Sequence, residues 1–283
     1  MIENLDSGWF EGRRRLGFLR RRGTGPKLLL LHGVLRCALD FRPLLPLLDA
    51  DWDLFLLDQR GHGESEKTGE YRVLDYIGDA LEVVDAIGTD DLFLYGHSLG
   101  AMVAAAVAVE RAVCAAVLED PPFETMGDRM KGSAWQALFE GMRRFALRGG
   151  GVVGILEGIG SIQIPQREGG ARPLSSLRDR SALCWSAECL EQIDPAVLDP
   201  LVEGRWLHGW DWKGVFHRAR ASVRVLQGDV HAGAALEDAD LQAAGESGYG
   251  FEKVFFPGSG HQLHWSDAGR VAAVVNGLRN SGA

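Results

Sequence analysis

The feature that most constrains this chain is a Gly-x-Ser-x-Gly pentapeptide, Gly96-His97-Ser98-Leu99-Gly100, which lies between two apolar segments. The run Leu92-Phe93-Leu94 precedes it, and the alanine-rich stretch Ala101–Ala108 follows it directly. A buried strand that turns sharply into a helix holds the central residue in a strained backbone conformation, and small neighbours let the two elements approach closely. The sequence therefore predicts a strand, a tight turn and a helix, with Ser98 presented at the turn as a nucleophile.

Short apolar runs alternate with amphipathic segments along most of the chain, a pattern typical of a parallel sheet covered by helices. The clearest helix is predicted for residues 73–87, where apolar side chains recur at intervals of three and four residues. Strands are expected at eight apolar runs: Trp9–Glu11, Leu16–Arg20, Lys27–Leu31, Asp53–Leu57, Leu92–Tyr95, Ala115–Glu119, Val223–Gln227 and Phe251–Phe256. The predicted class is α/β, with a mostly parallel central sheet.

This alternation breaks down between residues 123 and 220, where several tryptophans occur. The stretch is predicted to be a helical lid inserted into a core that residues 1–122 and 221–283 form. Its glycines, at 149–151, 154, 158 and 160, predict a hinge or a loose loop. Its aromatic rings can line an apolar pocket or simply hold the lid on the core, and both interpretations stay open. The candidates for the pocket are Leu35, His97, Trp185, Trp206 and Trp210.

Composition excludes several classes of partner. The net charge of -9 argues against nucleic acid, because a phosphate-binding surface needs a basic excess. The arginine clusters 13–15 and 20–22 are the local exception, expected on the solvated faces of an N-terminal hairpin. Apolar stretches are too short, or too weakly apolar, to span a bilayer. Four cysteines without C-x-x-C spacing, and no secretory signal before them, predict reduced thiols in a cytoplasm. The protein is expected to be a monomer or a homodimer.

Four motifs, taken in their order along the chain, indicate a resemblance to a known family. Leu31-His32-Gly33-Val34 follows the third expected strand, residues 58–65 (Asp-Gln-Arg-Gly-His-Gly-Glu-Ser) follow the fourth, the Ser98 pentapeptide follows the fifth, and Gly260-His261 follows the last. Over nearly its whole length the chain resembles the α/β-hydrolase superfamily. The resemblance implies that His261 is the general base for Ser98. It also implies a backbone N–H donor to the oxyanion from the loop after the third strand.

The oxyanion that forms when Ser98 attacks a carbonyl needs preorganised N–H donors. The turn supplies one from Leu99, at the positive end of a helix dipole. Matching the loop motif to the family places the second at Val34, with Leu35 as a less favoured substitute.

The acid that orients His261 stays open between two aspartates. Most members of the family carry it after the seventh strand in a Gly-x-x-Asp arrangement, but here that position holds His231, and Asp229 lies two residues earlier. The family's alternative follows the sixth strand, where this chain has Asp120 before two prolines that stiffen the turn. Asp120 is favoured. Its neighbour Glu119 is disfavoured because successive strand residues point to opposite faces.

These parts predict a serine hydrolase, an esterase or lactonase that cleaves a carboxylic ester or lactone of a small, largely apolar molecule through an acyl-enzyme. No cofactor and no metal are expected. Haloalkane dehalogenases and epoxide hydrolases of this family need a carboxylate where the chain has Ser98. Two alternatives stay open: a carbon–carbon bond hydrolase of ring-cleavage products, and a ligand receptor on the same fold with little turnover.

Overall fold

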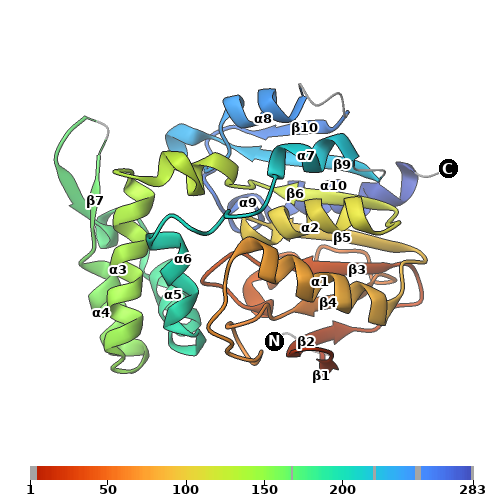
Figure 1. The fold of residues 1–283 in the computed structure, drawn as a ribbon, viewed down its shortest axis with the longest axis horizontal. Helices are drawn as coiled ribbons and strands as arrows, with labels where there is room; N and C mark the ends of the chain where they lie inside the picture. The colour runs from red at the N-terminus through yellow and green to blue at the C-terminus, as the bar shows by residue number, and fades with distance from the viewer. Residues whose placement is uncertain (1–4, 167, 219–220, 246–249, 282–283) are drawn as a thin grey trace.

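Strands and helices alternate along the chain in the computed structural model, which describes residues 5–166, 168–218, 221–245 and 250–281 (Figure 1). The strands are β1 (Asp6–Glu11), β2 (Arg15–Arg21), β3 (Lys27–Leu31), β4 (Asp53–Leu57), β5 (Leu92–His97), β6 (Ala115–Glu119), β7 (Gln163–Pro165), β8 (Ala171–Pro173), β9 (Ser222–Gly228) and β10 (Glu252–Phe256). The α-helices are α1 (Val73–Ile87), α2 (Leu99–Glu110), α3 (Ala134–Arg148), α4 (Gly151–Gly160), α5 (Arg180–Gln192), α6 (Asp199–Val202), α7 (Trp212–Arg218), α8 (Asp238–Gly245), α9 (Leu263–Ser266) and α10 (Ala268–Asn276).

Eight strands form one sheet in the order β1-β2-β4-β3-β5-β6-β9-β10. β2 is antiparallel to β1 and β4, and the pairs from β4 to β10 are all parallel. The eight predicted strands and the helix over residues 73–87 are confirmed, with ends that differ by at most a few residues. The chain order reverses between β3 and β5, so the loops after these two strands diverge at a crevice at the carboxyl edge of the sheet.

The sheet is buried on both faces because its central strands are apolar at successive positions. Leu29 and Leu31 of β3 face the side that α1 and α2 cover, whereas Leu28 and Leu30 face the side that α10 covers. Helix α2 is buried along nearly its whole length. Its alanines lie against the sheet on one side and against α1 and α7 on the others (Figure 1). Small side chains therefore let α2 lie close to the strands that it joins.

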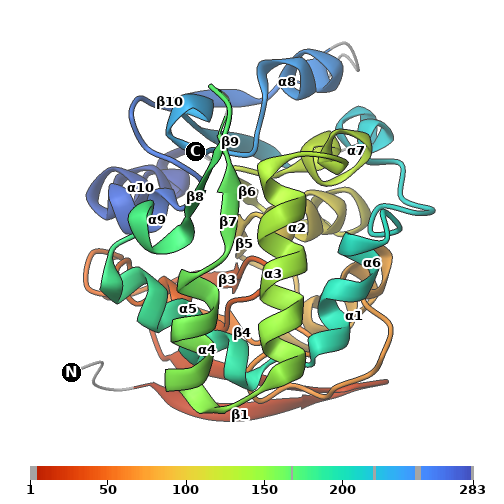
Figure 2. The ribbon, with the colours of Figure 1, turned by 90° about the vertical axis from the view of Figure 1, so that its left-hand side faces the viewer.

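Within the range 123–220, helices α3, α4, α5 and α6 lie beyond the carboxyl edge of the sheet, with the short β7–β8 hairpin beside them (Figures 1 and 2). We call these four the lid helices. Helix α7 lies instead beside α2 on the face of the sheet.

The expectation of a loose glycine-rich loop is correct only for residues 149–151, which have positive φ angles and reverse the chain between α3 and α4. The later glycines lie within α4. Gly158 contacts the ring of Phe145 so closely that a Cβ there would lie 2.3 Å from it. The segment is helical because the glycine lets α4 pack tightly against α3.

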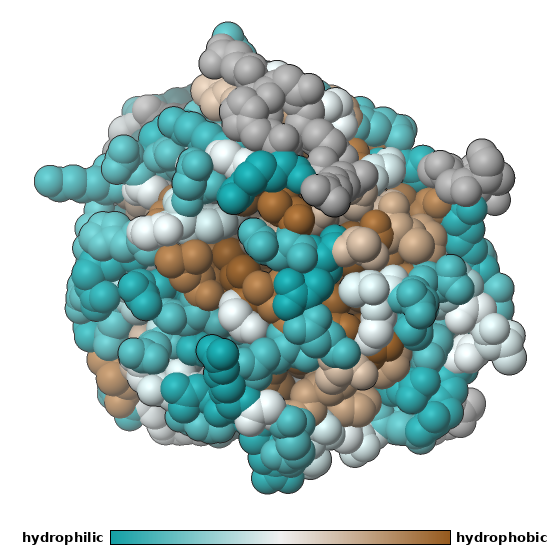
Figure 3. Space-filling model, turned by 45° about the vertical axis from the view of Figure 1, so that its right-hand side comes forward, coloured by the Kyte–Doolittle hydropathy of each residue, from teal (hydrophilic) through white to brown (hydrophobic). Residues whose placement is uncertain are grey.

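Hydrophilic residues predominate on the face shown in Figure 3, and hydrophobic residues show mainly in the hollows between them. No helix in the described part of the chain is long and apolar enough to cross a membrane.

The arginines of the N-terminal clusters lie on the β1–β2 hairpin and its turn, beside acceptors. Their partners include Glu82 for Arg13, Glu66 for Arg14, Glu11 for Arg15, Asp53 for Arg20, the Leu45 carbonyl for Arg21 and Asp6 for Arg22. These clusters therefore leave little uncompensated positive charge on the hairpin.

Candidate active site

Ser98 lies between β5 and α2 with φ 54° and ψ −115°, a conformation that residues with side chains rarely adopt. The turn needs its glycines. A Cβ at Gly96 would lie 2.1 Å from the Gly100 carbonyl oxygen, and a Cβ at Gly100 would lie 1.8 Å from the Leu31 carbonyl oxygen. The loop after β3 is also adjacent, since a Cβ at Gly33 would lie 3.2 Å from Ser98 Cβ. The pentapeptide thus has a steric cause, and it holds Ser98 strained at the start of a helix.

Two backbone N–H groups beside this serine, those of Leu99 and Val34, have no acceptor among the described residues. Leu99 is the first residue of α2, where N–H groups lack a partner within the helix. The substitute donor, Leu35, gives its N–H to His62 Nε2 at 3.2 Å. The geometry therefore favours Val34 over Leu35 as the second donor toward Ser98.

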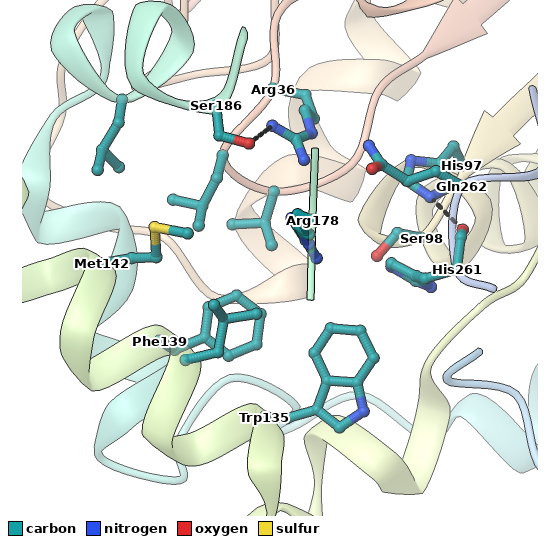
Figure 4. A pocket seen from close by; sticks show the side chains of 14 residues that line it. Arg36, His97, Ser98, Trp135, Phe139, Met142, Arg178, Ser186, His261 and Gln262 are labelled. Carbon is teal, nitrogen blue, oxygen red and sulfur yellow. Dashed lines mark hydrogen bonds between the residues drawn. The ribbon is translucent and has the colours of Figure 1, made fainter. Parts of the chain in front are cut away.

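The imidazole of His261, from the loop after β10, is paired with Asp120, the first residue after β6. Its Nδ1 lies 2.6 Å from Asp120 Oδ2; the carboxylate is fully buried, while 14% of the imidazole side chain is exposed. Because Nδ1 is held by the carboxylate, Nε2 is the nitrogen left for proton transfer. Ser98 and His261 line the same cavity (Figure 4), and no hydrogen bond joins them in the described part of the chain. Such bonds are often long until substrate binds.

The Asp120 carboxylate is fixed by the end of β9 and by the loop after it. It accepts hydrogen bonds from the backbone N–H groups of Gly228 at 3.3 Å, Ala235 at 2.7 Å and Leu236 at 3.3 Å. Asp120 itself has φ 43°, so the chain turns sharply here to present the side chain. The carboxylate is consequently locked in one position facing His261.

Asp229 belongs to the same loop, but its carboxylate binds elsewhere. It accepts from the N–H of His231 at 2.8 Å and of Gly258 at 3.2 Å, and these bonds lower the pKa of Asp229. The structure therefore brings His261 together with Asp120 and leaves Asp229 as a cap of its own loop.

A narrow cavity of about 40 Å³ lies in front of Ser98. Ligand cavities usually measure roughly 300 to 1,000 Å³, so the site is closed over its nucleophile. Its apolar side is formed by lid-helix residues Trp135, Leu138, Phe139, Met142 and Leu190. Its polar side is formed by Arg36, Arg178, Ser186 and Gln262 (Figure 4).

Two of the five pocket candidates, Leu35 and His97, line this cavity, and the three tryptophans do not. Trp185 is buried and donates its indole N–H to a carboxylate behind the site. Trp206 is buried in the main core, and Trp210 packs against that core from its edge. These three rings therefore hold the lid segment on the core, which is the simpler of the two interpretations that the sequence left open.

The aromatic residue that does cover the site is Trp135. Its ring meets His261 edge-on, with centroids 5.1 Å apart, and it stacks on Phe139 of the same helix at 6.1 Å. No feature of the sequence around Trp135 distinguishes it from the other tryptophans of the lid, and only the packing of α3 over the carboxyl edge of the sheet assigns it.

A second histidine, His264, is fully buried between two carboxylates behind the site. Its Nδ1 lies 2.8 Å from Glu119 Oε1 and its Nε2 lies 3.2 Å from Asp40 Oδ2. Burial opposes the charged ring, but the attraction of Glu119 and the hydrogen bonds to both carboxylates prevail and raise the pKa of His264 to about 9. The start of α10 is capped by Asp267 and not by His264.

His97 lies between these two histidines and is kept neutral. Its Nε2 lies 2.9 Å from the His261 carbonyl oxygen, and burial, reinforced by the nearby His261 and His264, lowers the pKa of His97 well below its usual value. Asp40, His97 and His264 present possible metal-ligand atoms within 4.8 Å of one another. Both ring nitrogens of His264 and one of His97 are already hydrogen-bonded, so a metal would have to displace these contacts.

Comparisons with known proteins agree with this architecture. The family model described as "alpha/beta hydrolase fold" matches residues 26–154, a range that includes Ser98 and Asp120 but not His261. The 2-(acetamidomethylene)succinate hydrolase of Mesorhizobium japonicum is 38% identical over 85 residues, which are 29% of this chain and 30% of that protein. Epoxide hydrolase B of Mycobacterium tuberculosis is 37% identical over 84 residues, 28% of this chain and 24% of that protein.

The chain therefore aligns with less than a third of the length of either relative. The likeness in structure extends much further. The crystal structure of E-2-(acetamidomethylene)succinate hydrolase superposes with a TM-score of 0.74 and 20% identity, covering 98% of this chain and 100% of that one. Strand order, serine turn and this superposition together define an α/β-hydrolase fold. The chain therefore has the fold of the α/β hydrolases, and its residues 26–154 match the model of that family.

Proposed function

We propose that this protein is a serine hydrolase that cleaves a carboxylic ester or a lactone through an acyl-enzyme on Ser98. The observation that carries the proposal is the pair of the buried Asp120 carboxylate with His261, with Nδ1 and Oδ2 2.6 Å apart, at a cavity that the strained serine also lines. Epoxide opening of the kind named for one relative does not fit, because the family's epoxide hydrolases need a carboxylate at the position of Ser98.

In the proposed reaction, His261 Nε2 removes the proton of the Ser98 hydroxyl as its oxygen attacks the carbonyl carbon. The N–H groups of Val34 and Leu99 stabilise the oxyanion of the tetrahedral intermediate. The imidazolium, paired with Asp120, then protonates the leaving alkoxide, and the carbon–oxygen bond breaks to give the acyl-enzyme. Water, deprotonated by His261, attacks the acyl carbonyl, and Ser98 is released with its proton restored.

Admission of a substrate requires a change in the lid helices, since the cavity of about 40 Å³ is smaller than a small ester with its leaving group. We propose that residues 123–220 act as the lid and that α3 moves with Trp135, which covers His261 in the closed state. A closed lid excludes water and strengthens the electrostatic contacts of the site.

Ser98→Ala tests the mechanism. We expect turnover of short esters and lactones to fall by a factor on the order of 10⁶, since loss of the nucleophile in a serine hydrolase has an effect of this size. The Ser98→Ala protein should keep the far-ultraviolet circular dichroism of the parent, and Ser7→Ala on the exposed strand β1 is the matched control.

Mass spectrometry of the parent with a slow ester should show an acyl adduct on the peptide that contains Ser98. Multiple turnover with that adduct would exclude the ligand receptor. Turnover retained in the Ser98→Ala protein would exclude the serine mechanism.

A further inference from the structure

Two arginines line the cavity from opposite sides of the boundary between core and lid. Arg36 lies in the loop after β3, and Arg178 lies just before lid helix α5. Figure 4 shows both among the side chains around the space beside Ser98. A cavity expected to hold a largely apolar molecule has no need of two guanidinium groups.

Arg36 is held by neighbours. Its Nη1 donates to Ser186 Oγ at 3.0 Å, and its Nε lies 3.8 Å from Asp40 Oδ1. When the side-chain amide of Gln262 is oriented with its oxygen toward Arg36, that oxygen accepts hydrogen bonds from Arg36 Nε and Nη2, each at 3.1 Å. Arg36 is thus a fixed group whose charge is partly balanced by Asp40.

Arg178 differs because its guanidinium has no hydrogen-bond or ion-pair partner in the described part of the chain. Burial, together with the positive charge of Arg36, lowers the pKa of Arg178 to about 10. Half-buried and buried arginines normally reach a carboxylate or carbonyl, since an unpaired cation away from water is costly. We therefore expect the unpaired guanidinium of Arg178, which lines the cavity beside Ser98, to bind an anionic group of a ligand.

The other charged groups around the site have partners. Asp40 and Glu119 pair with Arg36 and with His264, whose raised pKa keeps it charged at neutral pH. The Asp120 carboxylate is held by His261 and by three backbone N–H groups. Arg178 lines the cavity without such a partner among the described residues, so this side of the cavity is suited to a ligand that bears a carboxylate.

We propose that the substrate carries a carboxylate, separate from the bond that is cleaved, and that Arg178 binds it with Arg36 beside it. The inference rests on the proposed function and names its substrate class: a half-ester of a small dicarboxylic acid, or a lactone that bears a carboxylate. A planar guanidinium matches a carboxylate with two parallel hydrogen bonds. One unpaired guanidinium fits a carboxylate better than the dianion of a phosphate monoester.

The polar side of the cavity then orients the substrate, and the apolar side formed by α3 receives the rest of it. Because Arg178 belongs to the lid segment and Ser98 to the core, a carboxylate held by Arg178 draws these two parts together over the scissile bond. The expectation of a largely apolar substrate is revised in this one respect.

Binding to the Ser98→Ala protein tests the inference without any turnover. We expect succinate to bind more tightly than butanoate, as measured by isothermal titration calorimetry. Adding Arg178→Gln to the Ser98→Ala protein should weaken the binding of succinate by roughly 30-fold or more. Arg178→Lys should retain part of the affinity. Arg180→Gln, two residues away on an exposed position, is the matched control and should bind succinate as the parent does.

Turnover of an ester pair gives the second measurement. Monoethyl succinate has a carboxylate in place of the terminal methyl group of ethyl butanoate, so the ratio of their kcat/KM values isolates the contribution of the charge. We expect the parent to prefer monoethyl succinate and Arg178→Gln to lower this ratio by roughly 30-fold. The melting temperature of Arg178→Gln should be equal to or above that of the parent, because an unpaired cation is removed, whereas loss of a structural arginine would lower it.

The outcomes separate the two proposals. Succinate binding that Arg178→Gln abolishes, with no Ser98-dependent turnover, would support the carboxylate site and exclude the hydrolase. Ser98-dependent turnover with equal use of both esters, or binding of inorganic phosphate more tightly than succinate, would overturn the carboxylate site and leave the hydrolase intact.

Discussion

Two neighbouring carboxylates at the end of β6 each meet a histidine from the segment after β10, in opposite surroundings. Asp120 pairs with His261 at the cavity, and Glu119 pairs with His264 in the core behind it. The two carboxylates point apart because successive residues at a strand end face opposite sides of the sheet. One short segment of sequence thus supplies two acid–histidine pairs with different properties.

The number of carboxylates that are hydrogen-bonded to each imidazole determines whether that histidine can transfer a proton. His264 has one on each ring nitrogen, Glu119 and Asp40, so both of its N–H groups are occupied and it stays protonated at neutral pH. His261 has only Asp120, on Nδ1, and its Nε2 is left at the cavity. A base must be able to gain and lose a proton during each cycle. The comparison therefore supports the proposal that His261 transfers the proton, with His264 as structural support.

The largest expected effect is at the cavity pair. Asp120→Asn removes the charge that stabilises the His261 imidazolium, and we expect kcat to fall by roughly 10⁴-fold, as for neutralised acids of other serine hydrolase triads. Asp229→Asn is the matched control, since this carboxylate only caps its own loop, and its kcat should change by less than about threefold. Steady-state kinetics on a short ester would measure both. A crippled Asp229→Asn beside an active Asp120→Asn would reverse the assignment of the acid.

Glu119→Gln breaks the other pair. It leaves the His264 imidazolium buried with one carboxylate fewer, and it weakens the bonds from Tyr95 and from the N–H groups of Leu263 and His264. We expect the free energy of unfolding to fall by roughly 3 to 5 kcal/mol, as when one partner of a buried ion pair is removed.

Urea denaturation measures the effect of Glu119→Gln, with Asp85→Asn as the control. Asp85 pairs with Arg111 at the surface, and such pairs contribute about 0 to 1 kcal/mol. A Glu119→Gln protein as stable as the parent but without activity would contradict the division of roles between the two pairs.

The strands, the helix over residues 73–87 and the serine turn could be predicted because each follows from local sequence. The period of the apolar residues distinguishes strand from helix, and the glycines at positions 96 and 100 act on neighbours within the same turn or on the adjacent strand. Helix α4 could not be predicted from the sequence, because its glycines by themselves favour a loop. Its stability comes from the close packing of Gly158 on Phe145, which the sequence does not show.

The site residues divide in the same way. Ser98, His261 and the loop of Val34 belong to motifs, so the sequence indicates them without a structure. The choice of acid depends on how the loop after β9 surrounds Asp120, a tertiary contact that sequence reasoning could favour but not decide. Arg178 and Trp135 lie in a lid segment without any motif. They enter the site only through the docking of α3 and α5 on the core.

The pH dependence of stability gives the smallest expected effect and tests the core pair alone. The folded pKa of His264, about 9, is above its ordinary value of 6.5, so its stabilising contribution is complete below pH 6.5 and is lost as the pH rises through 9. The difference corresponds to about 3 kcal/mol. Unfolding free energies from urea titrations at pH 6.5, 8 and 9.5 should decline accordingly, and less steeply in Glu119→Gln. His62, whose pKa burial lowers to about 3, acts in the opposite direction and mainly below pH 6.5, outside this range. A parent protein with equal stability at pH 6.5 and 9.5 would show that His264 is not the charged partner of the two carboxylates.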